Sequence, residues 1–139
     1  MTIEYKEHYD IIIDPKKQFY FPRTERWIMD SFGLDVEQAV LYQVILNNRY
    51  LTWTLDYIAD AFGWSRAKAA RQLDNMVAMG IIIRHTIQVN ESGKRRSYYL
   101  AKYTKEGRRP LAEQEAIEIE ARKSLKQAYS TKRFYNKDK

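Results

Sequence analysis

The chain has 139 residues, 45% of them hydrophobic and 30% charged, which is enough for one domain with a modest core. Because it contains no cysteine, disulfide bonds and thiolate metal sites are excluded. No stretch approaches the roughly 20 apolar residues that a membrane-spanning helix needs, and the first ten residues lack the basic-then-apolar order of a signal peptide, so we expect a cytoplasmic protein that does not enter a membrane.

The net charge of +6 is unevenly distributed. Residues 64–110 carry 11 basic and 3 acidic side chains, whereas residues 35–63 carry 1 basic and 4 acidic ones. A concentrated basic patch attracts phosphates and gains free energy from counterion release. The distribution therefore favours a nucleic acid over an acidic protein as the partner.

Residues 1–21 read as an N-terminal arm. Within it, Ile11-Ile12-Ile13 is a candidate short strand, and residues 18–21 are extended and aromatic. Pro22 suits the first position of a helix that Gly33 ends. Two alternatives remain open here, an ordered arm laid over the core and a regular element.

The next helix begins at Asp35, which forms an approximate capping box with Gln38. Apolar residues follow at helical spacing to about Asn47, and Asn47-Asn48-Arg49 has loop composition. Residues 50–54 alternate between apolar and polar side chains, which predicts a short strand.

Residues 54–83 read as two helices around a tight turn, followed by a strand. Thr54 caps a helix that Gly63 ends, and Ser65 caps a second helix that ends at Gly80. The second helix has one apolar stripe, formed by Ala69, Leu73, Met76 and Val77. We therefore expect it to bury one edge and to offer the opposite edge to a partner.

From Ile81 the hydrophobic period changes to two residues, which predicts a β-hairpin with a turn at 90–94 and a second strand over 97–103. Ile81, Ile83, Ile87 and Val89 share one face. Three consecutive basic residues, Lys94, Arg95 and Arg96, lie at its tip. This suits contacts with phosphates, although a solvated hairpin whose charges protect an edge is the alternative.

Residues 105–110 are expected to form a linker and residues 111–129 a helix, followed by a frayed basic tail over 130–139. A stripe of Ile117, Ala121, Leu125 and Ala128 runs along this helix. It packs either on the domain or against its copy in a dimer, because an isolated helix of this length is marginal.

Seven residues of the helix-turn-helix segment resemble the winged helix-turn-helix of bacterial DNA-binding proteins: Ser65, Ala69, Arg71, Leu73, Met76, Gly80 and Ile82. With Phe21-Pro22 and Val40-Leu41-Tyr42, residues 18–103 resemble the N-terminal domain of plasmid replication initiators and DnaD-type primosome proteins. MarR-like and PadR-like regulators look similar. The resemblance implies an α+β, mostly helical fold, in which residues 22–104 form a three-helix core with a β-hairpin wing, and a homodimer on double-stranded DNA.

The predicted DNA-binding residues lie on the second helix and at the hairpin tip: Ser65, Arg66, Ala67, Lys68, Arg71, Gln72, Asn75, Lys94, Arg95 and Arg96. Lys68 and Arg71 are expected to point outward into the major groove, and Arg71 suits guanine. Gln72 and Asn75 are adenine readers by type, and Ala67 suits a thymine methyl. Ser65 and Arg66 suit backbone phosphates.

No constellation of reactive residues predicts an enzyme, a metal site or a cofactor. His8 and His85 have no acidic partner at ligand spacing, and Asp56 and Asp60 are better explained as a capping and a solvated acid. The leading hypothesis is a sequence-specific DNA-binding protein, acting as a transcriptional regulator or as an origin or transfer-site binding factor of a plasmid or other mobile element. The alternative is a protein-interaction module of a replication or conjugation complex.

Overall fold

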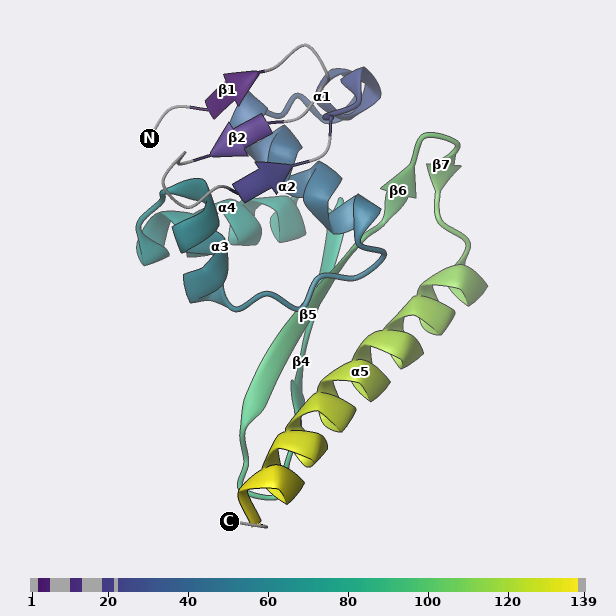
Figure 1. The fold of residues 1–139 in the computed structure, drawn as a ribbon. Coiled ribbons are helices and arrows are strands. Elements are labelled where there is room, and N and C mark those ends of the chain that lie inside the picture. The colour runs from purple at the N-terminus through teal and green to yellow at the C-terminus, as the bar shows by residue number, and fades with distance from the viewer. Residues whose placement is uncertain (1–2, 6–10, 14–18, 22, 138–139) are drawn as a thin grey trace.

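The computed structural model describes residues 3–5, 11–13, 19–21 and 23–137, with side chains described over 23–129. The described part is α+β, as the sequence predicts, with helices followed by an antiparallel hairpin and a long last helix (Figure 1). The elements are β1 (Ile3–Tyr5), β2 (Ile11–Ile13), β3 (Phe19–Phe21), α1 (Arg26–Phe32), α2 (Val36–Asn47), α3 (Leu55–Phe62), α4 (Arg66–Ala78), β4 (Ile82–Gln88), β5 (Arg95–Ala101), β6 (Tyr103–Thr104), β7 (Gly107–Arg108) and α5 (Leu111–Lys137). None of the described helices is long and apolar enough to cross a bilayer.

The first three strands form an antiparallel sheet in the order β1-β2-β3, with Ile11 opposite Phe21. The strand predicted at residues 11–13 and the extended segment before Pro22 are both present. Helix α1 begins at Arg26 rather than at Pro22, and Gly33 ends it in the left-handed conformation, as predicted. Pro22 itself lies outside the described residues.

Local capping determines where the next three helices begin and end. The Asp35 carboxylate accepts a bond of 2.8 Å from the Gln38 N–H, and the Gln38 side chain accepts one from the Asp35 N–H, which completes the predicted capping box. Ser65 Oγ likewise accepts from the Lys68 N–H at 3.1 Å and caps α4. Between α3 and α4, Gly63 adopts φ = 67°, which glycine tolerates without steric cost and which permits the tight turn.

Helices α2, α3 and α4 pack around one hydrophobic cluster, into which α4 inserts Ala69, Leu73 and Met76. The strand predicted over 50–54 is shorter than expected. Only Leu51 pairs, exchanging backbone hydrogen bonds of 2.8 and 2.9 Å with Tyr99 of β5. This single bridge fastens the segment before α3 to the hairpin.

The base of the β4–β5 hairpin has an apolar side chain on each face and is covered on both, whereas Arg84, His85 and Thr86 further along β4 are exposed. Ile82 and Ala101 pair directly and join the cluster of α2–α4. Ile83 and Leu100, the next pair along, face a second cluster shared with α5. The hairpin therefore lies between the helical core and α5, which runs alongside it (Figure 1).

The apolar stripe of α5 packs on the hairpin of the same chain through Ile117, Ala121 and Leu125, whereas Ala128 is exposed. This supports the first of the two roles expected for the stripe. The helix continues past Tyr129 to Lys137, so the backbone at residues 130–137 is helical where a frayed tail was expected.

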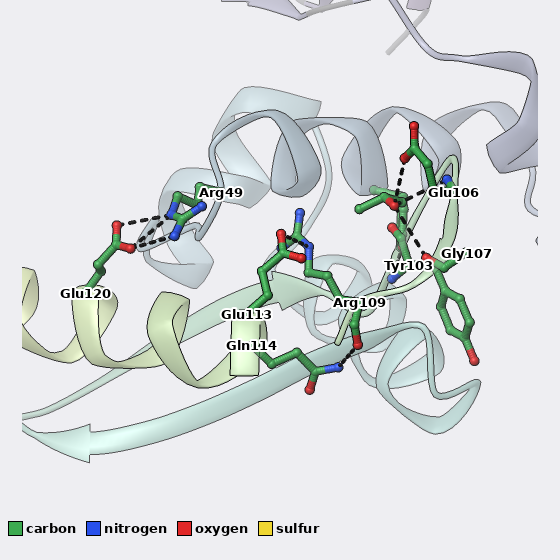
Figure 2. Close-up of polar contacts among 10 residues, drawn as sticks. Arg49, Tyr103, Glu106, Gly107, Arg109, Glu113, Gln114 and Glu120 are labelled. Atoms are coloured by element: carbon green, nitrogen blue, oxygen red, sulfur yellow. Dashed lines mark hydrogen bonds and ion pairs between the residues drawn. The ribbon is translucent and has the colours of Figure 1, made fainter. Parts of the chain in front are cut away.

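Polar contacts hold the start of α5 and the segment before it (Figure 2). Arg49 lies in the loop after α2, and its guanidinium donates hydrogen bonds to both carboxylate oxygens of Glu120. These bonds lower the pKa of the Glu120 carboxyl. Gln114 donates a bond of 3.1 Å to the Arg109 carbonyl. Part of the expected linker is ordered as the β6–β7 hairpin, with Tyr103 opposite Arg108.

Tyr42 of α2 ties this small hairpin to the core. Its hydroxyl donates to the Tyr103 carbonyl at 2.8 Å and accepts from the Tyr103 N–H at 3.2 Å. Burial disfavours the phenolate and raises the pKa of Tyr42 to about 12.

We expect Ile117→Ala to lower the free energy of unfolding by about 2–5 kcal/mol, because it leaves a cavity between α5 and the hairpin. Ile119→Ala is the matched control, two positions along the same helix and 59% exposed, and should change it by less than about 0.5 kcal/mol. Urea unfolding of both variants measures the difference. Equal effects would contradict the packing of α5 described here.

The raised pKa of Tyr42 predicts a loss of stability at high pH. The folded state holds the Tyr42 hydroxyl proton more tightly than the unfolded state. The protonated hydroxyl therefore stabilises the fold fully below about pH 10, and this stabilisation is lost between about pH 10 and 12. Urea unfolding at pH 9 and pH 11 should show the wild-type chain losing about 1 kcal/mol more than Tyr42→Phe, which cannot ionise. Parallel losses would refute the assignment.

Candidate nucleic-acid interface

A groove of about 540 Å³ lies between the start of α3, helix α4 and one face of the β4–β5 hairpin. Five basic side chains line it, together with the single acid Asp56: Arg66, Arg84, Lys94, Arg95 and Arg96. We call this the basic groove. Three of these side chains come from the hairpin tip, so the structure brings the tip and the start of α4 to one concave surface.

At the start of α4, Ser65 and Arg66 are both exposed. Ser65 Oγ is already occupied by the Lys68 N–H. Arg66 lies 3.3 Å from Asp56, and the two side chains are 69% and 71% exposed. An ion pair this exposed contributes little stability, so a phosphate can compete with Asp56 for the guanidinium.

Three of the predicted residues form a line along the exposed edge of α4. Ala67, Arg71 and Asn75 are four residues apart, which places them on one helix face, and all three are exposed. This is the edge that the sequence assigned to a partner.

Lys68 and Gln72 differ from the prediction, because both are held against α2. Lys68 Nζ lies 3.3 Å from Glu37 Oε1 and 5.5 Å above the Trp64 ring. Gln72 accepts a bond of 2.8 Å from the Gln38 side chain. Their main contacts fix α4 on α2, instead of leaving both side chains directed outward.

The three basic residues of the hairpin tip are not equivalent. Lys94 and Arg95 are exposed. Arg96 is half-buried, donates to the Tyr129 hydroxyl at 2.7 Å and to the Thr52 carbonyl, and lies 5.7 Å from the Tyr129 ring. It therefore connects the hairpin, the segment before α3 and α5.

Arg84 is a groove residue that sequence reasoning missed. It lies on β4, lines the groove and donates a hydrogen bond of 2.7 Å to Asp74, which connects β4 to α4. The two-residue period already separates Arg84 from the face that meets α5. What the period does not indicate is that the Arg84 face opposes α4.

His85 packs at the interface between the hairpin and α5. Its Nε2 lies 2.5 Å from Glu118 Oε1 on α5, and its ring lies 5.5 Å from that of Tyr98. The histidine therefore has an acidic partner across the interface between hairpin and helix. His8 lies outside the described residues.

Truncation to alanine should lower the free energy of unfolding at Arg96 and leave it nearly unchanged at Arg95. Arg96→Ala leaves the Thr52 carbonyl and the Tyr129 hydroxyl without this donor, so we expect a loss of about 1–3 kcal/mol in the free energy of unfolding. Arg95→Ala, the adjacent control, should change it by less than about 0.5 kcal/mol because the side chain is exposed. Thermal or urea unfolding decides, and an unaffected Arg96→Ala would show that these contacts do not stabilise the fold.

No protein-family model and no curated protein matches the chain. Among solved structures, a possible transcriptional regulator from Methanosarcina mazei Go1 aligns over 99% of this chain and 95% of its own length, at 12% sequence identity and a TM-score of 0.44.

Proposed function

We propose that α2, α3, α4 and the β4–β5 hairpin form a winged helix-turn-helix that binds double-stranded DNA in a sequence-specific way. The order of the elements, the left-handed turn at Gly63 and the bridge between Leu51 and Tyr99 support this assignment. The observation that carries it is the exposed edge of α4 beside the basic groove.

The edge of α4 has the dimensions and chemistry for base readout. A helix fits the major groove, which is about 12 Å wide, and a spacing of four residues covers about 6 Å along the helix axis. Arg71 can contact guanine with two hydrogen bonds, Asn75 can contact adenine, and Ala67 leaves room for a thymine methyl. These three residues are proposed to carry the sequence preference.

The groove cations are proposed to bind the DNA backbone. Lys94 and Arg95 are exposed at the hairpin tip, and Arg66 and Arg84 form ion pairs with Asp56 and Asp74. Contacts to phosphates set register and orientation without carrying sequence information. They also make the affinity fall as salt rises, because each neutralised phosphate releases counterions.

The biological role proposed for this binding is occupancy of an operator, or of an origin or transfer site of a plasmid or other mobile element. As a homodimer, the protein would occupy two half-sites about 34 Å apart. The second candidate is a protein-interaction module within a replication or conjugation complex. It is favoured by the contacts within the chain that engage Lys68, Gln72 and Arg96.

The test is a selection of preferred sites from random duplexes, followed by affinity measurements on variants over a range of salt concentrations. We expect Arg71→Ala to weaken the preferred site by about 1–3 kcal/mol and to relax base preference. Lys94→Ala should weaken all duplexes alike and reduce the salt slope by about 1. Arg26→Ala, an exposed cation on α1 away from the basic groove, is the control and should do neither.

Equal effects of Arg71→Ala and Lys94→Ala on preferred and random duplexes would refute the division between base and phosphate contacts. Absence of duplex binding at low salt would refute the proposed function and favour the interaction module.

A further inference from the structure

An aromatic pair, Trp53 and Tyr57, lies at the α3 end of the basic groove. Neither residue contacts DNA in the proposed function. Trp53 lines the groove and also packs on the core of α2–α4. Its ring lies 4.9 Å from that of Tyr57, tilted by 59°, and Tyr57 is 45% exposed. The core and the Tyr57 ring thus support Trp53, while part of it remains accessible from the groove.

Cations from other elements line the same groove. Arg66 approaches from α4, and Arg84 and Arg95 approach from the hairpin. A volume of about 540 Å³ is within the range of ligand sites, roughly 300–1,000 Å³. A nucleotide bound here would place its base near an indole and its phosphates near guanidinium groups.

An aromatic ring inside a cationic groove discriminates between paired and unpaired bases. Bases within a duplex are covered on both faces by their neighbours and cannot stack on a protein side chain unless they leave the helix. An unpaired base can, and proteins that bind single strands combine basic grooves with aromatic side chains for this purpose.

We propose that the DNA strand whose phosphates the groove cations hold continues past the end of the duplex as a single-stranded segment, with one unpaired base stacked on Trp53. This extends the proposed function, since the duplex is the one held by α4. The substrate class is thus a junction between double and single strands, such as a partly melted site.

The experiment compares a blunt duplex that carries the selected site with the same duplex extended by a five-nucleotide single-stranded overhang on one end or the other. We expect one of the overhangs to raise the affinity of the wild-type chain about 10-fold. The gain should disappear in Trp53→Ala and in Trp53→Leu, which retains apolar volume without a ring face. The gain is taken relative to the affinity of each variant for the blunt duplex.

Trp27→Phe serves as the control, because Trp27 packs beside Phe32 and Tyr42 and does not line the groove. It should retain the full gain from the overhang. Urea unfolding of each variant shows whether a lost gain reflects a lost fold.

The outcomes separate this proposal from the proposed function. Blunt-duplex binding without a gain from either overhang overturns the stacking site alone. Binding of a single-stranded oligonucleotide through Trp53, without duplex binding, overturns the proposed function and the junction as substrate, and leaves stacking on Trp53 standing. Tryptophan quenching that is absent in Trp53→Leu reports the stacking site. If free thymidine monophosphate produces it at concentrations as low as the oligonucleotide does, the strand assignment is overturned in favour of a free nucleotide.

Discussion

The burial of the base of the β4–β5 hairpin on both faces is the constraint on which the rest of the structure depends. Alternation along β4 sends Ile82 toward the helical core and Ile83 toward α5, and Tyr99 and Leu100 do the same on β5. A shift of one residue in register would send each set of side chains to the opposite face, where the packing surface does not match it. The position of the hairpin relative to α4, and with it the shape of the basic groove, therefore follows from packing.

Features governed by local chemistry could be predicted from the sequence. The capping box at Asp35, the cap at Ser65 and the turn at Gly63 depend on residues within a few positions of one another. The periods of α4 and of β4 identified their buried faces for the same reason. The extent of α5 could not be read this way, because no glycine or proline after Tyr129 marks a helix end.

The candidate site was predicted less completely, because contacts between distant residues decide which cations remain available. Periodicity gives the angle of Lys68 around its helix, but it does not show that Glu37, 31 positions earlier, lies within reach. The same holds for Gln72 with Gln38 and for Arg96 with Tyr129. Arg71 and Ala67 escaped this limitation because they lie furthest from the buried stripe, where neighbouring elements do not reach.

The contact between Arg96 and Tyr129 makes the C-terminal helix and the groove energetically dependent on each other. Arg96 lines the groove, and Tyr129 packs beside the cluster under α5, so moving the end of α5 changes the set of donors that a bound strand meets. If the proposed strand took this guanidinium, the end of α5 would lose the same contact, because a coupling free energy between two sites is reciprocal. The C-terminal helix would then be a second place at which occupancy of the groove is set.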